Sequence, residues 1–207
     1  MKKIISAYIV TCLLFCFFNN NLFSQEQTPP RTTRQLTKYE RMFPQIMYGD
    51  NIYQKGSNWF NIGFGKGYCT NYKKENVNLS LTYHHRYKAL FFRGGWHFSG
   101  PVIFLKRPME QLNDFHIGGG IRFEDRWYNF AFFIGPSFAS TWIPKEDNPN
   151  ITTIYAQLGA HTELQFTFKY FYDMGIGTSL YGSFNKRYQV VGIQLHFYFS
   201  NAFVRKY

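Results

Sequence analysis

Residues 191–199 read VGIQLHFYF, and this stretch decides the fold of the chain. Bulky apolar residues occupy every odd position, while glycine or a polar residue occupies every even one. A period of two is that of a β-strand, whose successive side chains point to opposite faces. The stretch therefore predicts a strand with one bulky apolar face and one small or polar face.

Seven earlier segments repeat this alternation. In chain order their apolar faces are carried by Phe60, Ile62 and Phe64; Val77, Leu79, Leu81 and Tyr83; Leu90, Phe92, Trp96 and Phe98; Phe115, Ile117, Ile121 and Phe123; Tyr128, Phe130, Phe132 and Ile134; Ile154, Ala156, Leu158 and Leu164; and Met174, Ile176 and Leu180. Eight tilted segments of about ten residues suit an apolar layer roughly 25 Å thick. The sequence thus predicts an all-β protein, an antiparallel up-and-down transmembrane barrel of about eight strands over residues 58–199.

The predicted connections support this topology. Longer ones are expected at 69–76, 99–114, 140–150 and 182–187, and tight turns near 87–88, 125–126 and 169–170. Outer-membrane barrels alternate long external loops with short periplasmic turns in this way, and an even number of strands leaves both termini in the periplasm.

The second face of the strands decides between two kinds of barrel. A soluble, lipocalin-like barrel would turn its bulky face inward around a ligand and its other face to water. Here the other face carries eight glycines: Gly63, Gly65, Gly118, Gly120, Gly159, Gly175, Gly177 and Gly192. Small residues suit a crowded lumen, since eight strands enclose just enough space for side chains. We therefore favour the arrangement in which the bulky face meets lipid.

At this point residues 58–199 resemble the small eight-stranded outer-membrane β-barrel family. The resemblance rests on the strand pattern, and it implies a place in the outer membrane among its lipids. The last strand also looks like the segment that such proteins present to the assembly machinery. Residues 200–207 follow that strand as a tail, which departs from the family pattern.

The N-terminal part has a different composition. Lys2 and Lys3 precede an apolar run over residues 4–18, which predicts a secretory signal peptide over 1–24 with cleavage near Ser24. About 15 apolar residues fall short of the roughly 20 that a transmembrane helix needs. Residues 25–57 are polar and rich in turn residues, and we expect a mostly irregular periplasmic segment. Residues 39–48 could form a short helix, but Pro44 interrupts it.

Charge and cysteine content exclude several classes of protein. The formal net charge is +11, and loss of Lys2 and Lys3 leaves +9, but no compact basic stripe with interleaved aromatic residues suggests nucleic-acid binding. After signal cleavage Cys69 is the only cysteine, so neither an intramolecular disulfide nor a cysteine pair for a metal is available.

The inward face carries charged residues of both signs. We predict a lumen polar network formed by Arg86, Arg93, Arg122, Glu124, His161, Glu163 and Asp173. A belt of aromatic residues at the two lipid interfaces is predicted from Trp59, Tyr68, Tyr83, Trp96, Trp127, Tyr170 and Tyr188.

Two histidines are the candidates for chemistry. His97 and His116 lie on adjacent predicted strands and are expected to face each other, but no third ligand is evident, so we expect no metal site and no cofactor. Some small outer-membrane barrels modify lipid acyl chains. His97 with Ser99, or His116 with Asp114, would be the catalytic groups in that alternative.

The sequence favours a monomeric barrel with a structural or interaction role through its loops or periplasmic segment. A general porin is excluded, because conduction needs 16 or more strands. The alternatives are a lipid-modifying enzyme and a barrel component of a secretion or transfer apparatus. A surface or periplasmic protein partner is expected beside outer-membrane lipid. The apolar loop residues Ile103, Phe104 and Leu105 would either contact such a partner or extend a strand.

Overall fold

The computed structural model describes residues 45–48, 51–101, 110–145, 147–148 and 151–204, and most of these residues form β-strands. The strands are β1 (Gln45–Tyr48), β2 (Asn51–Gln54), β3 (Trp59–Cys69), β4 (Lys74–Tyr87), β5 (Leu90–Gly100), β6 (Gln111–Glu124), β7 (Tyr128–Pro144), β8 (Thr152–Lys169), β9 (Met174–Asn185), β10 (Val190–Ser200) and β11 (Phe203–Val204). No helix in these residues is long and apolar enough to cross a membrane.

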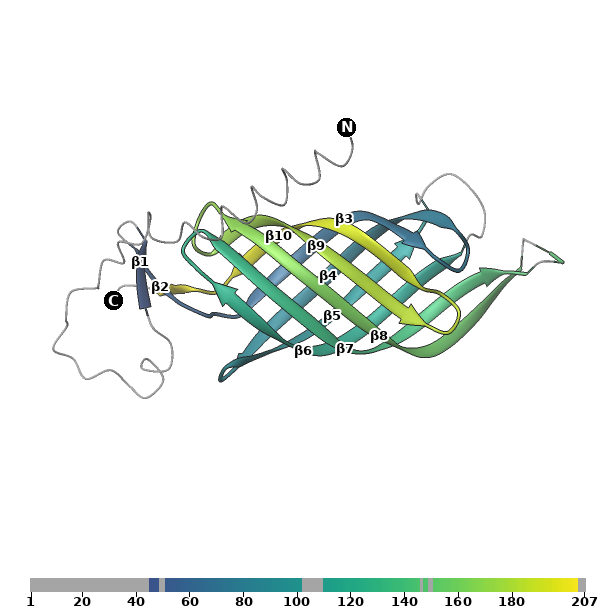
Figure 1. The fold of residues 1–207 in the computed structure, drawn as a ribbon, viewed down its shortest axis with the longest axis horizontal. Coiled ribbons are helices and arrows are strands. Elements are labelled where there is room, and N and C mark those ends of the chain that lie inside the picture. Colours follow the sequence, from purple (N-terminus) through teal and green to yellow (C-terminus); the bar gives the residue numbers. More distant parts are fainter. Residues whose placement is uncertain (1–44, 49–50, 102–109, 146, 149–150, 205–207) are drawn as a thin grey trace, which may run out of the picture. The chain divides into compact units, whose positions relative to one another are not determined.

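Strands β3 to β10 close into one barrel, which Figure 1 shows from the side. Each strand pairs antiparallel with its neighbours in the chain, and β10 closes the barrel by pairing with β3 from Val190↔Cys69 to Ser200↔Trp59. The predicted all-β class, the strand number and the up-and-down order are confirmed.

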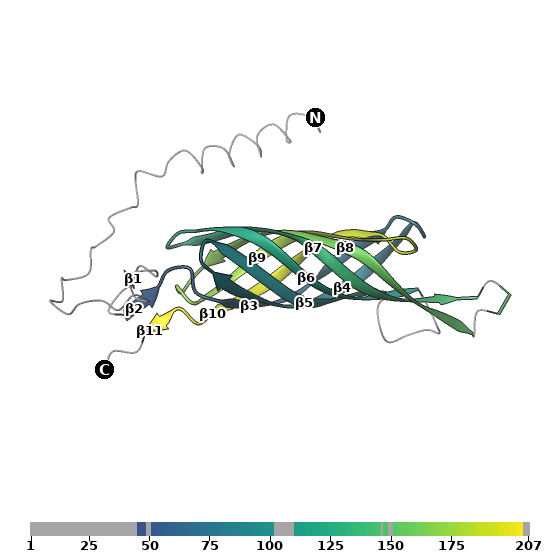
Figure 2. The ribbon, with the colours of Figure 1, turned by 90° about the horizontal axis from the view of Figure 1, so that it is seen from below.

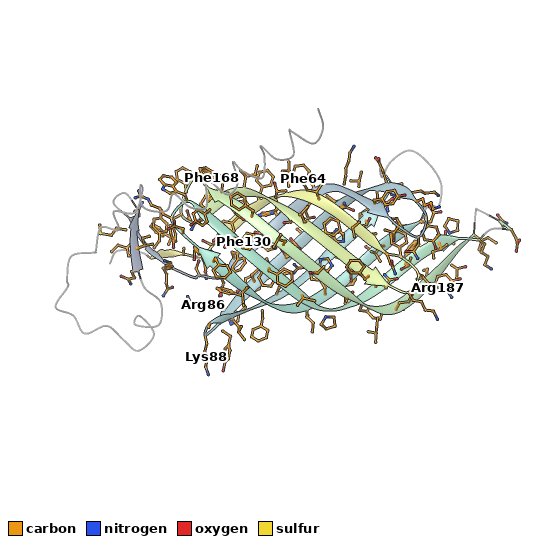
Figure 3. All side chains as sticks on the ribbon, viewed as in Figure 1. Phe64, Arg86, Lys88, Phe130, Phe168 and Arg187 are labelled. Atoms are coloured by element: carbon orange, nitrogen blue, oxygen red, sulfur yellow. The ribbon has the colours of Figure 1, made fainter. Side chains whose placement is uncertain are left out.

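The alternation along the strands sorts side chains into an outside and a lumen. Leu158 and Ile117, on the bulky face, are 81% and 68% exposed, and Figure 3 shows Phe64 and Phe168 on the outside as well. Side chains on the other face, such as Asn78 and Gln165, are fully buried. The molecule therefore buries polar groups and exposes apolar ones, the reverse of a water-soluble protein.

The connections differ between the two ends of the barrel. Residues 88–89, 125–127 and 170–173 form the short turns that were predicted at one end. At the other end, the β5–β6 and β7–β8 connections, 101–110 and 145–151, are the longer ones. The predicted long loops 69–76 and 182–187 are wrong, because β4 begins at Lys74 and β9 continues to Asn185, which leaves four residues in each turn. Residues 103–105 lie outside the described residues.

A second, three-stranded sheet forms from both ends of the described chain (Figure 2). Strand β1 pairs with β2, and β2 pairs with β11 of the C-terminal tail. Residues 45–48 and 51–54, within the segment predicted to be mostly irregular, thus form strands, and the helix considered over 39–48 is absent from residues 45–48. The physical reason is long-range: Tyr53 packs with Tyr172 of the β8–β9 turn and with Ala202, which no local pattern reveals. Residues 1–44, including the predicted signal peptide, lie outside the described residues.

Candidate functional site in the barrel lumen

The lumen holds two polar clusters separated by aromatic side chains. The histidine cluster consists of Arg93, His97, Asp114, His116, His161 and Glu163, and the arginine cluster consists of Trp59, Arg122, Glu124, Lys169 and Tyr198. All of these side chains come from inward positions of the strands, so each strand places charged groups in the lumen simply by its period of two.

An ion pair lies at the centre of the histidine cluster. Arg93 Nη1 donates to Glu163 Oε2 at 2.7 Å, and the two side chains are 2% and 3% exposed. The other carboxylate oxygen of Glu163 accepts from Gln165 at 3.0 Å and from Gln194 at 3.4 Å. Both ends of the pair are thus hydrogen-bonded, which compensates for the loss of water around buried charges.

The contacts of the histidines fix which ring nitrogen carries hydrogen. Arg93 Nη2 lies 2.7 Å from His116 Nε2, and because a guanidinium only donates, this nitrogen is an acceptor without hydrogen. His161 Nδ1 lies 3.0 Å from Asp114 Oδ2, so it donates to the carboxylate, which also accepts from the Ser183 hydroxyl. The rings of His116 and His161 stack with centroids 4.0 Å apart.

The arginine cluster contains two cations around one carboxylate. Glu124 Oε1 lies 2.8 Å from Arg122 and 3.0 Å from Lys169, which is fully buried. Arg122 also donates to the Tyr198 hydroxyl at 2.7 Å, and its guanidinium lies 4.3 Å from the Trp59 ring centre. This arrangement combines ion pairing with a cation–π contact.

The arginine cluster also binds the chain segment that precedes the barrel. Gly56 donates its backbone N–H to Glu124 Oε2 at 2.7 Å, and Arg122 donates to the Ser57 carbonyl at 2.7 Å. Gly56 has a φ of +72°, and a Cβ there would collide with the Arg86 guanidinium. The left-handed backbone therefore favours glycine at this position, and the guanidinium would have to shift for any other residue. In the nearby β8–β9 turn, burial raises the pKa of the Tyr172 phenol, which stays protonated at neutral pH.

The structure divides the seven residues predicted as one network. Arg93, His161 and Glu163 meet in the histidine cluster, and Arg122 and Glu124 meet in the arginine cluster. Arg86 and Asp173 lie elsewhere. Arg86 sits next to the β4–β5 turn and donates to the carbonyls of Lys55 and Gly56, while Asp173 belongs to the turn 170–173, just before β9 begins. Both positions are at strand ends, and Arg86 lies at the edge of the arginine cluster, since its guanidinium is 5.9 Å from the centre of the Phe91 ring, which Arg122 also contacts.

The expected face-to-face pair of His97 and His116 is wrong in register. Strand β5 pairs His97 with Asp114 and Gly95 with His116. Gly95 is needed here, because a Cβ would lie 2.8 Å from His116 Nε2. Neither proposed catalytic pair reaches a surface: His97, Ser99, Asp114 and His116 are at most 4% exposed, and Ser99 accepts a hydrogen bond from Asn76. These residues give no support to chemistry on membrane lipids.

Several lumen residues were missed or misplaced from the sequence. Gln165 and Lys169 share the inward parity of His161 and Glu163, and this signal would have found them. Trp59 and Tyr188, expected at the lipid interface, are each 1% exposed inside the barrel. Trp59 stacks on His84 with centroids 4.1 Å apart, and Tyr188 accepts from Asn76 at 2.6 Å. A ring at a strand end or in a turn can face either way, and its contacts with other strands decide which.

Comparison with known proteins identifies the fold alone. The sequence matches no protein-family model and no curated protein. Among solved structures, Neisserial surface protein A has a TM-score of 0.55 at 6% identity, with 69% of this chain and 95% of that chain covered. Ail, the attachment invasion locus protein of Yersinia pestis, has a TM-score of 0.50 at 10% identity, with 70% and 95% covered. The chain thus has the fold of small eight-stranded outer-membrane barrels.

Proposed function

We propose that this protein is a monomeric outer-membrane barrel with a structural or interaction role, and that it is not a general porin. The observation that carries the proposal is the inverted distribution of side chains: a band of exposed Phe, Ile and Leu surrounds a lumen filled by buried polar and aromatic groups. An apolar outer band requires an apolar medium, and a closed barrel satisfies its backbone hydrogen bonds there.

The filled lumen argues against diffusion of solutes. Strands β3 to β10 enclose the two polar clusters and their aromatic neighbours, among them Phe91 and Phe133. Eight-stranded barrels have interiors just wide enough for such side chains. We expect vesicles that contain the folded protein to retain small sugars and ions, as vesicles without it do. Release of solutes at a rate proportional to the amount of folded protein would contradict this part of the proposal.

The location is tested by heat-modifiability. Outer membranes from cells that express the full chain are run on a gel with and without boiling. A band in the outer-membrane fraction that migrates differently only before boiling supports a closed membrane barrel. A soluble periplasmic protein with no shift would refute it and would favour the lipocalin-like alternative.

The β7–β8 hairpin supports the interaction role. The β8–β9 pairing ends at Gly159↔Asn185, whereas β8 begins at Thr152. Within the described residues, positions 152–158 of β8 therefore have a strand neighbour only in β7. A free strand edge offers unpaired N–H and C=O groups to a strand of another protein. Ile154 and Leu158 on this part of the hairpin are 58% and 81% exposed.

A photo-crosslinking experiment tests that role. In one variant a photoreactive residue replaces Ile154. In a matched control it replaces Phe166, an outward-facing residue of the same strand that is paired with both neighbouring strands. A discrete protein adduct at position 154 in intact cells, absent at 166, supports a partner at the hairpin. Equal labelling at both sites, or lipid adducts alone, would contradict it.

A further inference from the structure

Several ring nitrogens of the histidine cluster make no hydrogen bond with another described group. Within the described residues, neither nitrogen of His97 has a hydrogen-bond partner, nor does His161 Nε2 or His116 Nδ1. The three side chains are buried, at 1%, 3% and 4% exposure. A buried polar atom without a partner destabilises the folded state, so three such imidazoles in one cluster require an explanation.

Another lumen histidine shows that this is not the general state of the barrel. His196 is equally buried, yet Nε2 lies 2.8 Å from the Thr167 hydroxyl and Nδ1 lies 2.7 Å from the Ser179 hydroxyl. Both of its nitrogens are satisfied by protein groups. Apart from His84 Nδ1, the buried histidine nitrogens without a partner in the described part of the chain belong to His97, His116 and His161, which project into the lumen from β5, β6 and β8.

The spacing of these groups suits a metal ion. One ligand atom each from Asp114, His116 and His161 lies within 4.8 Å of the others. A tetrahedral zinc ion with nitrogen and oxygen ligands at about 2.0–2.2 Å holds its ligand atoms about 3.3–3.6 Å apart. Side-chain rotations that bring the ligand atoms about 1 Å closer together would place all three at bonding distance. His97 pairs with Asp114 across the strands, and its ring centre is 5.6 Å from that of His161.

We propose that Asp114, His116 and His161, with His97 as fourth ligand, bind a divalent transition-metal ion, with Zn²⁺ as the best match. Imidazole nitrogens with one carboxylate suit zinc and its neighbours in the first transition row, whereas Mg²⁺ and Ca²⁺ prefer oxygen ligands alone. His161 binds the ion through Nδ1, so that His161 and Asp114 exchange their 3.0 Å hydrogen bond for bonds to the metal, and His161 Nε2 then carries the hydrogen, 3.7 Å from Glu163 Oε2. Binding exchanges the Arg93–His116 hydrogen bond for a metal–nitrogen bond.

The charge of the cluster is compatible with a cation. With neutral imidazoles, the carboxylates of Asp114 and Glu163 exceed the single positive charge of Arg93 by one. Arg93 keeps its 2.7 Å pair with Glu163 when it releases His116, so neither group is left uncompensated. The ion thus offsets the remaining negative charge and gives a bond to His97, which has no hydrogen-bond partner within the described residues.

The test measures the metal content of the folded barrel. The full chain is refolded in detergent with Zn²⁺, desalted, and analysed for zinc per folded chain, with the folded fraction taken from heat-modifiability. We expect one zinc ion in the wild type and in H196Q, and at least a tenfold loss of affinity in H161Q and H116Q. Substitution with Co²⁺ should give the visible absorption of a tetrahedral nitrogen and oxygen site.

Two results would overturn the proposal. One is a wild-type barrel that folds but retains no stoichiometric zinc. The other is zinc retained equally by H161Q and H116Q but lost in H85Q, since His85 is exposed on the outer face and would mark adventitious binding. If H161Q and H116Q do not fold, H97Q and D114N replace them, because either must also weaken binding if these residues are ligands.

Discussion

Replacing Glu163 by glutamine removes one charge of the buried Arg93–Glu163 pair and tests whether the lumen is as dry as the structure implies. The two side chains are 2% and 3% exposed and their closest atoms are 2.7 Å apart. With charge centres about 4 Å apart and an effective dielectric constant of about 20, the attraction is about 4 kcal/mol. Breaking a buried pair on one side costs about 3–5 kcal/mol, because the other charge is left uncompensated. We therefore expect E163Q to lower the free energy of unfolding by about 4 kcal/mol.

The measurement is a urea titration of the protein refolded into lipid vesicles, with the folded fraction read from boiled and unboiled gel bands. E110Q is the matched control, because Glu110 pairs with Lys74 at 2.9 Å but the lysine is 54% exposed. A surface pair contributes only about 0–1 kcal/mol. The double variant R93M/E163Q should lose less than the sum of its two single variants. If E163Q and E110Q have equally small effects, the lumen is hydrated and the reasoning fails.

Three further predictions concern other parts of the molecule. G56A should destabilise the barrel by about 2 kcal/mol, since the left-handed backbone alone costs about 1–2 kcal/mol and the Cβ displaces Arg86. Urea titration measures this loss against the control G94A, where a Cβ meets open space, and equal effects of the two substitutions would contradict the prediction. I117R should cost about 2–4 kcal/mol in vesicles and Y87R at the strand end about 0–1 kcal/mol, and the idea fails if the two are alike. Cys69 is 1% exposed, so a maleimide should label it only after unfolding, and rapid labelling of the folded barrel would refute its place in the lumen.

The alternation of residues along the chain by itself determines the barrel architecture. Because the period of two is a local property of the chain, it assigns each side chain to one of two faces independently of its neighbours in space. The glycines on the second face were sufficient to predict that the bulky face points outward, and Ile117 and Leu158 are exposed as this predicts. The same parity places Arg93, Arg122 and Glu163 in the lumen.

The tertiary structure alone decided which lumen groups meet. Contacts across the barrel depend on the register of eight strands, and a shift of two residues keeps every parity while it changes every partner. For this reason the sequence predicted that His97 faces His116, whereas in the structure His97 pairs with Asp114 and the ring of His116 stacks on that of His161. Strand ends are equally non-local, as Arg86 and Tyr188 show.

The sheet formed by β1, β2 and β11 is the clearest case of this limit. Its strands are four, four and two residues long, too short to carry a readable period, and two of them are separated by the whole barrel in sequence. They pair because closure of the barrel brings the segments before β3 and after β10 together, where Gln54 donates to the Ala202 carbonyl at 2.7 Å. The sequence by itself determined the faces of the strands, and only the closed barrel determined their partners, since register and closure are properties of the whole chain.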